Sequence, residues 1–346
     1  MRVHQVLSGA GAFDAVTEQA LAFRRLFRAW GWGGGDVAAS ISPQVANEIA
    51  PLASLRPAER DILLIHYSGY APRLRGALAF DNRKLLISHN ITPARWFWDH
   101  DPTAAVSCAL GRKQLPEFAA AVDIAAGVSL FNARELGSDT VIPILFDPSK
   151  LGEPPTAAAP PGPPTIMFVG RIAPHKRQDA VIRAFALYRR RHAPDARLVL
   201  VGRPVNETFA AAIRGLAEQL APGAIDIEFD LTPQQLAQRY RSAHAFLCMS
   251  EHEGFCIPLL EAFHFGLPVV ARAVGGVPEV AGDAALLLDG DDDERVAAEL
   301  LALAVGDAEL RAALRERSRQ RVGAYAPERT VRTLRTTLEA LRAPLD

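Results

Sequence analysis

Two cations follow an apolar stretch near the middle of the chain, in the segment FVGRIAPHKRQD at residues 168–179. The apolar stretch ends at Gly170, Arg171 follows directly, and Lys176 stands at the predicted start of a helix. A guanidinium, an ammonium and the free N–H groups of a helix start are groups that bind a pyrophosphate, and a glycine lets the backbone approach it closely. The pattern predicts a diphosphate site, with solvated loop charges as the alternative interpretation of both cations.

Two carboxylates follow a second apolar stretch, in SEHEGFCIPLLEAFHFGLPVVA at residues 250–271. Glu253 and Glu261 lie eight positions apart, about 80° beyond two full helical turns, so both can border one site if Glu253 lies on the loop. The N–H groups of Gly254, Phe255 and Cys256 stay free at the helix start. Glu261 lies among apolar residues, where an unpaired carboxylate would cost several kcal/mol, so it needs a hydroxyl or cationic partner. The alternatives are a charge that complements the helix dipole for Glu253 and a salt bridge to the sheet for Glu261.

Parallel strands and crossover helices must position these residues, because both groups directly follow uniformly apolar stretches. After a proline-rich connector at 149–165, stretches such as TIMFVGR, ARLVLVG and HAFLCMS alternate with helical patterns near 177–191, 206–221, 233–242 and 256–266. Before the connector, DILLIHYS and KLLISHNI alternate with helical patterns in the same way. The sequence predicts two doubly wound α/β domains that bind ligands at the carboxyl ends of their strands.

Composition limits the classes of protein that fit. A length of 346 residues predicts two domains, and 38 Lys and Arg against 39 Asp and Glu give a net charge of -1, which provides no field to attract nucleic acid. With 49% hydrophobic and 22% charged residues, disordered, collagen-like and disulfide-scaffold classes are excluded. Three cysteines at 108, 248 and 256 are too widely spaced for a disulfide framework or a zinc site, which favours a reducing compartment. We expect a cytoplasmic protein without a signal peptide or a membrane span, with peripheral contact at the inner face of the cell membrane left open.

The ordered segments GRIAPHK, EHEGFCIPLLEAFHFGLPVVA, GGVPEV and GDAALLLD, within residues 165–325, resemble the retaining GT-B glycosyltransferases of sequence family 4, also called glycosyl transferases group 1. The N-terminal half is similar to them more loosely, through SGAGAFDAV and SHNITP. The resemblance implies two Rossmann-like doubly wound domains that face a cleft. It implies an acceptor-binding domain at 1–150, a nucleotide-sugar-binding domain at 151–325 and a C-terminal helix at 326–346 that packs back on the N-terminal domain.

The resemblance also implies roles in the donor site. Arg171 and Lys176 would hold the donor diphosphate. Glu253 would contact hydroxyls of the donor sugar, and Glu261 would bind those of the ribose. Backbone groups would complete the site, with the sugar pocket lined by Gly254, Phe255 and Cys256 and the nucleotide base bordered by Gly202 and Leu231.

In the N-terminal half, Gly9 and Gly11 precede a predicted helix, so their backbone could approach phosphate oxygens. Asp14 occupies the last glycine position of a G-x-G-x-x-G motif, which disfavours a nicotinamide cofactor. His89 matches the family's histidine beside the donor sugar, with a structural strand-end histidine as the alternative. Three further residues near predicted strand ends are candidates for the acceptor site: His66, Tyr67 and Asn132.

Two further patterns favour structural roles. Phe23, Phe27 and Trp30 alternate with arginines at 24, 25 and 28 and could touch anionic lipid, but a packed helix with a solvated face is the preferred interpretation. The acidic run at 291–293 precedes a helix, which predicts helix capping rather than metal binding.

With these features, the resemblance implies a retaining hexosyltransferase that moves a sugar from a UDP- or GDP-linked donor to a hydroxyl of a glycan or lipid-linked saccharide. We expect the product to be cell-surface polysaccharide or glycolipid, and we expect no metal, other cofactor or nucleic-acid partner. The alternatives are a sugar-nucleotide epimerase of the same fold and a non-catalytic sugar-nucleotide-binding partner protein. The predicted catalytic residues are His89, Arg171, Lys176 and Glu253.

Overall fold

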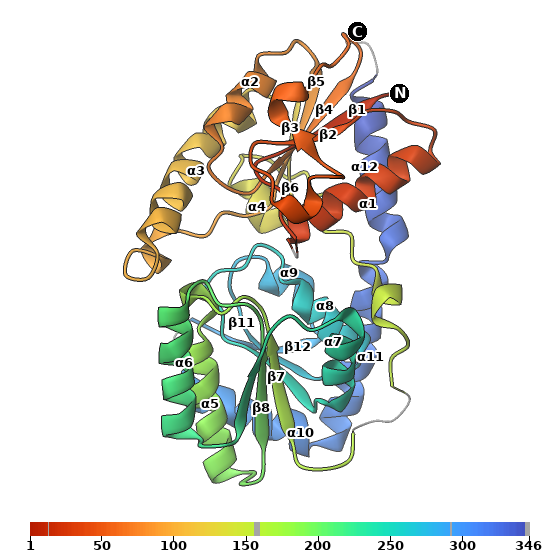
Figure 1. The fold of residues 1–346 in the computed structure, drawn as a ribbon. Helices are drawn as coiled ribbons and strands as arrows, with labels where there is room; N and C mark the ends of the chain where they lie inside the picture. Colours follow the sequence, from red (N-terminus) through yellow and green to blue (C-terminus); the bar gives the residue numbers. More distant parts are fainter. Residues whose placement is uncertain (13, 156–159, 291–292, 343–346) are drawn as a thin grey trace. The chain divides into compact units, whose positions relative to one another are not determined.

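The computed structural model describes residues 1–12, 14–155, 160–290 and 293–342. The chain forms two compact units. The N-terminal unit contains Met1–Trp98 and Pro102–Leu145 together with the segment that begins at Pro327, and the C-terminal unit contains Asp99–Asp101 and Phe146–Ala326. Helix α12 (Pro327–Ala340) therefore groups with the N-terminal unit and lies beside α1 (Figure 1). Arg335 of α12 lies over the Trp30 ring at 5.3 Å.

A parallel sheet forms the core of the N-terminal unit, with the strand order β3-β2-β1-β4-β5-β6 (Figure 1). The order reverses direction between β1 and β4, and in open α/β sheets ligands bind beside such a switch point. The strands are β1 (Val3–Leu7), β2 (Asp36–Ala38), β3 (Ala50–Pro51), β4 (Ile62–Tyr67), β5 (Arg83–Ser88) and β6 (Ile124–Gly127). The α-helices between them are α1 (Ala15–Ala29), α2 (Arg75–Leu78) and α3 (Pro102–Ala120), and α4 (Leu130–Arg134) follows β6.

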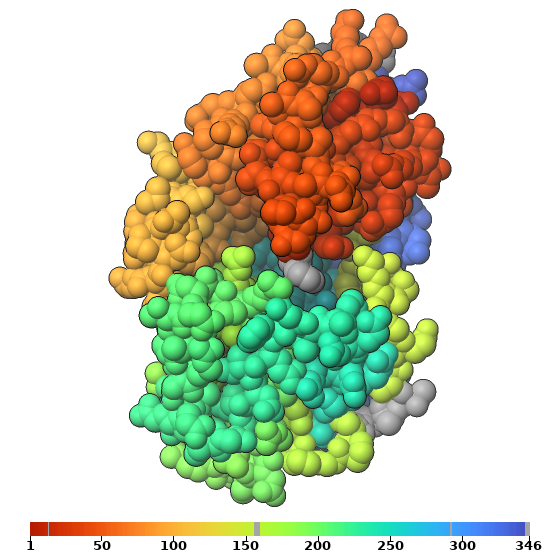
Figure 2. Space-filling view, viewed as in Figure 1, coloured from red at the N-terminus to blue at the C-terminus, as the bar shows by residue number. Residues whose placement is uncertain are grey.

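The C-terminal unit repeats this topology with the order β12-β11-β10-β7-β8-β9, and its switch point lies between β7 and β10. Its strands are β7 (Thr165–Val169), β8 (Arg197–Val201), β9 (Ile225–Glu228), β10 (Ala245–Cys248), β11 (Val269–Arg272) and β12 (Ala285–Leu288). Its helices are α5 (Gln178–Arg191), α6 (Glu207–Leu220), α7 (Pro233–Ser242), α8 (Ile257–His264), α9 (Val277–Ala281), α10 (Glu294–Gly306) and α11 (Ala308–Ala324). Atoms around α6 and α7 form much of the visible face of this unit (Figure 2). The prediction of two doubly wound α/β domains is confirmed.

Aspartates cap the N-terminal ends of α1, α10 and α11. Asp14 accepts hydrogen bonds from the N–H and the hydroxyl of Thr17 at 3.0 and 2.7 Å, which explains an aspartate at this end of the GAGAFD segment. Asp293 caps α10 by accepting from the N–H groups of Arg295 and Val296, as predicted for the acidic run. Asp291 and Asp292 lie outside the described residues.

The interpretation that α1 contacts lipid is wrong for three of the residues on which it depends. Phe23 and Phe27 are completely buried because they pack inward from the helix. Arg24 is also buried and forms an ion pair with Asp36 of β2, so its charge is not available to a lipid headgroup. Among the described residues, no helix is long and apolar enough to cross a membrane.

Gly202 lets two loops of the C-terminal sheet meet closely. It follows β8, and its N–H donates to the Glu228 carbonyl oxygen at 2.8 Å. A Cβ atom at this position would lie 2.0 Å from the Gly170 carbonyl oxygen, far inside van der Waals contact. The absence of a side chain therefore keeps the loop after β8 against the loop after β7.

We predict that Gly202→Ala lowers the free energy of unfolding by more than about 1 kcal/mol, because the new methyl group must push these backbones apart. Gly215→Ala is the matched control, since Gly215 lies within α6 with open space around its Cβ position, and should stabilise the protein by about 0.5–1 kcal/mol. Denaturant unfolding of the two variants measures both effects. Equal stability of Gly202→Ala and the wild type would contradict the close approach.

Candidate functional site

The loop after β7 presents both predicted cations at the switch point of the C-terminal sheet. Gln178 organises this loop, because its side-chain amide donates to the Arg171 carbonyl oxygen at 2.9 Å and accepts from the Ala173 N–H at 3.3 Å. A single 3-10 turn at Pro174–Lys176 follows. Arg171 is exposed, and within the described part of the chain its guanidinium makes no hydrogen bond or ion pair. The guanidinium can therefore bind an anion without first breaking an ion pair.

Lys176 and Glu253 form an ion pair that joins the loops after β7 and β10. The Lys176 Nζ lies 2.7 and 2.8 Å from the two carboxylate oxygens, and the side chains are 19% and 6% exposed. Burial is the largest single influence on the pKa of Lys176 and lowers it, but the charge and hydrogen bond of Glu253, together with the nearby Cys256 and Cys248, raise that pKa above its usual value. Lys176 is therefore cationic at neutral pH, and the structure brings together two residues that the sequence predicted separately.

A glycine pair, Gly275 and Gly276, fixes the backbone that carries Glu253. The Gly276 N–H donates to the Glu253 carbonyl oxygen at 3.0 Å. Gly275 has a φ of 56°, and a Cβ there would lie 2.0 Å from the same carbonyl oxygen. The sequence contained this signal in GGVPEV, but the supporting role of the glycines was not predicted.

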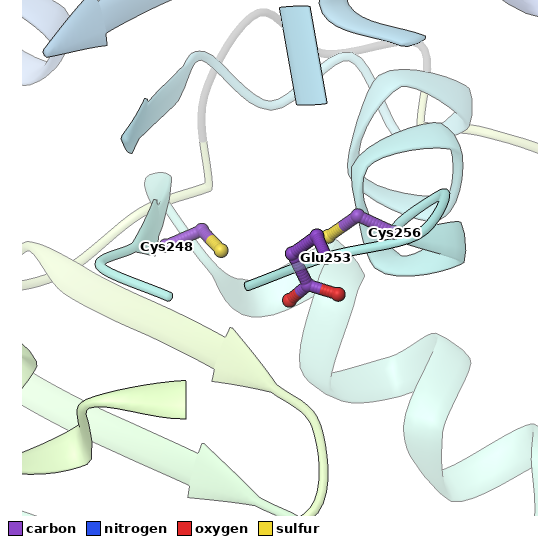
Figure 3. A group of neighbouring side chains, drawn as sticks. All are labelled: Cys248, Glu253 and Cys256. Atoms are coloured by element: carbon purple, nitrogen blue, oxygen red, sulfur yellow. The ribbon is translucent and has the colours of Figure 1, made fainter. Parts of the chain in front are cut away.

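Two buried thiols lie beside Glu253, and their sulfur atoms point toward one another (Figure 3). Cys248 ends β10 and Cys256 begins α8, so residues eight apart in sequence bring their sulfur atoms and the Glu253 carboxylate within 4.8 Å of one another. A hydrogen bond from Cys256 lowers the pKa of the Cys248 thiol, whereas burial raises that of Cys256. A metal ion in this cluster would have to displace the Lys176 ammonium from both oxygens of Glu253. The geometry favours the ammonium as the cation here.

Glu261 of α8 pairs with a tyrosine hydroxyl. The Tyr240 hydroxyl on α7 donates to Glu261 Oε2 at 2.7 Å, which confirms the prediction that Glu261 needs a hydroxyl or cationic partner. The alternative of a salt bridge to the sheet is not what forms. Burial raises the pKa of Glu261 above its usual value, although the hydrogen bond from Tyr240 acts in the opposite direction. The Tyr240 partner was not predicted, since it lies on another helix.

The remaining predicted donor residues lie on loops of the C-terminal unit. Gly254, Phe255 and Cys256 are buried at the start of α8, and the Phe255 ring packs on Tyr325 with ring centroids 5.3 Å apart. Leu231 is half-buried between β9 and α7. Their contacts with a donor stay predictions.

His89 follows β5 at the switch-point side of the N-terminal sheet. Its backbone N–H donates to the Tyr67 carbonyl oxygen at 2.8 Å, and its Nε2 lies 2.9 Å from the Nδ1 of His66. The His89 ring is half-buried, and burial lowers its pKa to about 3. His89 is therefore neutral at physiological pH, which makes it a hydrogen-bonding group rather than a cation.

The prediction that His66 and Tyr67 line the acceptor site is wrong. Both side chains are completely buried, because these residues lie within β4 rather than after it. The Tyr67 hydroxyl donates toward the Gly111 carbonyl oxygen and the Gln114 Oε1 at 3.0 and 2.9 Å. Neither residue can touch an acceptor directly.

Two other N-terminal candidates are engaged in local hydrogen bonds. Asn132 is fully buried, and its amide donates to the Asn90 Oδ1 at 3.1 Å, which supports the loop after His89. The Gly11 N–H donates to the Thr17 hydroxyl oxygen at 3.0 Å, so a phosphate would have to compete for it. Gly9 lies against Ser40, whose Oγ would be 2.9 Å from an added Cβ.

Residues 153–321 match the family described as glycosyl transferases group 1. The D-inositol 3-phosphate glycosyltransferase of Acidothermus cellulolyticus is 35% identical over 140 residues, which cover 38% of this chain and 31% of that protein. The chain thus spans less than a third of that relative's length in the match.

Two solved structures are similar over almost the whole chain. Sucrose-phosphate synthase from Thermosynechococcus elongatus has a TM-score of 0.75 at 18% identity and covers 98% of both chains. Anabaena HepE, solved with UDP and glucose, has a TM-score of 0.72 at 15% identity and covers 98% of this chain and 99% of its own. At these identities the likeness shows the fold, which is GT-B, as predicted.

We predict that Glu261→Gln stabilises the protein at neutral pH. A carboxyl whose folded pKa is raised contributes its full stability below about 4.5 and loses it as the pH rises through the folded pKa. Glutamine cannot ionise, yet its oxygen can still accept from Tyr240. The gain in the free energy of unfolding should therefore appear at neutral pH and become smaller as the pH falls toward about 4.5.

Denaturant unfolding at pH 7 and pH 4 measures this difference. Glu218→Gln, an exposed position on α6, is the control and should show no such pH-dependent gain. A Glu261→Gln variant less stable than the wild type at pH 7 would contradict the prediction.

Proposed function

We propose that the chain transfers a sugar from a nucleotide diphosphate sugar to an acceptor hydroxyl, because residues 153–321 match the family described as glycosyl transferases group 1. The observation that carries the proposal is the ion pair of Lys176 and Glu253 between the loops after β7 and β10, close in sequence to the exposed Arg171. Cations and a carboxylate at a switch point match a ligand that has both phosphate and hydroxyl groups.

The diphosphate is the group that Arg171 and Lys176 bind in this proposal. When the bond between the anomeric carbon and the phosphate oxygen breaks, negative charge develops on the leaving diphosphate, and two fixed cations stabilise it. When the Lys176 ammonium binds the phosphate oxygens, its ion pair with Glu253 becomes weaker. The freed carboxylate oxygens then accept hydrogen bonds from hydroxyls of the donor sugar.

The rest of the donor lies against the start of α8 and the neighbouring loops. Glu261, held by Tyr240, takes the ribose hydroxyls as an acceptor of hydrogen bonds. Backbone groups complete the site, with the sugar pocket at Gly254, Phe255 and Cys256 and the base beside Gly202 and Leu231. We propose a UDP- or GDP-linked hexose as the donor.

We propose retention of the anomeric configuration, with the acceptor attacking on the face from which the diphosphate departs. The acceptor oxygen forms the new bond to the anomeric carbon, and its proton passes to the leaving phosphate. In this proposal Glu253 is not a free nucleophile, because its oxygens pair with Lys176 before the donor binds and accept hydrogen bonds from sugar hydroxyls afterwards. The transfer therefore proceeds without a covalent sugar intermediate on this carboxylate.

The N-terminal unit binds the acceptor in this proposal, and His89 contributes to the donor-sugar contact. We propose a hydroxyl of a glycan or lipid-linked saccharide as the acceptor, in the synthesis of cell-surface polysaccharide or glycolipid. The relative from Acidothermus cellulolyticus is named for an inositol phosphate acceptor, but the match covers only 31% of its length. Three free cysteines support a reducing, cytoplasmic site of action.

Incubation with a panel of UDP- and GDP-linked sugars, followed by detection of released nucleoside diphosphate, tests the reaction. Proton NMR of the glycoside product reports the anomeric configuration. Formation of an epimerised sugar nucleotide, or donor binding without release of nucleoside diphosphate in the presence of a broad set of glycan acceptors, would contradict the proposed activity.

We predict that Arg171→Ala lowers kcat/KM by roughly ten- to a hundredfold, because a charge-assisted contact of about 1.5–3 kcal/mol is lost. Lys176→Ala should cause a larger loss, since it also leaves the Glu253 carboxylate buried without its cation. Arg183→Ala is the control, because Arg183 is an exposed arginine on α5 of the same unit. Equal activity of the Arg171 and Arg183 variants would show that Arg171 is a solvated surface charge.

We predict that a chelator leaves the turnover unchanged, since Arg171 and Lys176 supply the positive charge that the leaving diphosphate needs. Rates measured with and without EDTA after extensive dialysis test this expectation. Activity that disappears in EDTA and returns with Mg²⁺ or Mn²⁺ would show instead that a metal ion stabilises the leaving group.

A further inference from the structure

We propose that a buried chain of hydrogen bonds fixes the tautomer of His89, so that its Nδ1 carries a bare lone pair that can accept a hydrogen bond from a ligand hydroxyl. The chain of contacts runs from Arg24 through Asp36, Gln5 and His66 to His89. The inference rests on the proposed function and deepens it, because it identifies Gln5 and His66 as the residues that position His89.

The chain begins at a buried ion pair. The Arg24 Nε lies 3.0 Å from both carboxylate oxygens of Asp36, and its Nη2 lies 2.7 Å from Oδ1. The same Nη2 also donates to the Val3 carbonyl oxygen at 2.8 Å. A carboxylate paired in this way offers only hydrogen-bond acceptors to its other neighbours.

Asp36 determines how the side-chain amide of Gln5 is oriented. The Gln5 Nε2 lies 2.8 Å from Asp36 Oδ1 and 2.8 Å from the Ala20 carbonyl oxygen, and both of these atoms are acceptors. The reversed amide would place an oxygen against a carboxylate and a carbonyl, which is repulsive. Gln5 Oε1 therefore faces His66, where it can only accept a hydrogen bond.

Gln5 in turn determines which nitrogen of His66 carries the proton. The His66 Nε2 lies 3.0 Å from Gln5 Oε1 and must be its donor. Burial, with a smaller contribution from His89, lowers the pKa of His66 well below its usual value, so the ring is neutral and carries one N–H. The Nδ1 of His66 is consequently a bare acceptor.

The last step concerns His89, at the less buried end of the hydrogen-bond chain. The His89 Nε2 lies 2.9 Å from the bare Nδ1 of His66, so Nε2 must carry the His89 proton. Because His89 is also neutral, its Nδ1 has no hydrogen. Among the residues that the structure describes, this Nδ1 has no hydrogen-bond partner, and the ring is only half-buried. The lone pair of a neutral ring nitrogen accepts a hydrogen bond from a hydroxyl group, whereas it repels a carboxylate or phosphate oxygen.

The register of the sheet and the packing of α1 hold the hydrogen-bonded side chains in place. Gln5 pairs with Asp36 on one side and with Leu64 on the other, so His66, two residues beyond Leu64, lies on the same face of the sheet as Gln5. Helix α1 covers this face, and the Phe23 ring lies 5.9 Å from the His66 ring. Since well-packed apolar residues stabilise a core at least as well as buried polar ones, the chain points to a positioning role for His66 and Gln5.

Nitrogen-15 NMR of protein labelled at histidine tests the tautomer directly, with the His89 signals assigned by their loss in His89→Gln. We expect a protonated Nε2 and a bare Nδ1 in the wild type. His66→Asn can place an amide oxygen near the position of the lost Nδ1 and should preserve this tautomer. His66→Leu removes the acceptor, so its His89 ring should become a mixture of tautomers. A wild-type His89 protonated at Nδ1, or an unchanged His89 tautomer in His66→Leu, would overturn the proposal.

Kinetics with single-position deoxyfluoro analogues of the donor sugar test the ligand. One position should lose about ten- to a hundredfold in kcat/KM with the wild type and almost nothing with His89→Ala, because fluorine cannot donate to Nδ1. His66→Leu should reduce this discrimination, and His66→Asn should restore it. Equal sensitivity of the wild type and His89→Ala at every position would overturn the hydroxyl assignment. The NMR measurement needs no substrate, so failure of the proposed transfer reaction would be distinguishable from failure of the hydrogen-bond chain.

Discussion

The ion pair of Lys176 and Glu253 is the interaction on which the C-terminal site depends. Each side chain is buried too deeply to be left as an isolated charge, so each requires the other. The backbone of Glu253 is fixed in turn by the close approach of Gly275. A diphosphate that binds Lys176 replaces one anion by another, so the exchange does not leave the ammonium uncompensated. The same exchange releases a carboxylate at the moment when sugar hydroxyls need an acceptor.

Sequence predicted the parts of the site that follow directly from strand ends. Arg171, Lys176 and Glu253 stand immediately after uniformly apolar stretches, and parallel strands bring their carboxyl ends to one edge of a sheet. The apolar surroundings of Glu261 also predicted that it must have a partner. In these cases local sequence and the general geometry of α/β sheets are sufficient.

The parts that failed depend on contacts between distant segments. His66 and Tyr67 were placed after a strand, but β4 continues through Tyr67, and a shift of one or two positions decides whether a side chain is inside the unit or at its edge. Arg24 looked like a surface cation because nothing nearby in sequence reveals Asp36 of β2 as its partner. The pairing of Tyr240 with Glu261 likewise depends on how α7 packs beside α8, and the proximity of Cys248 to Cys256 depends on the path of the loop between β10 and α8.

The two units share one topology, but one unit keeps a lysine charged and the other keeps a histidine neutral. In the C-terminal unit, the charge and hydrogen bond of Glu253, with a contribution from the neighbouring cysteines, offset burial and keep Lys176 cationic, as the proposed binding of a diphosphate requires. In the N-terminal unit, burial keeps His89 neutral, and the ion pair of Arg24 and Asp36 is separated from it by two neutral side chains. Neither Lys176 nor His89 changes its charge near neutral pH, because their pKa values are displaced away from it in opposite directions. On the proposed function, Lys176 supplies positive charge to the leaving diphosphate, whereas the neutral His89 supplies a directional hydrogen-bond acceptor that adds no charge.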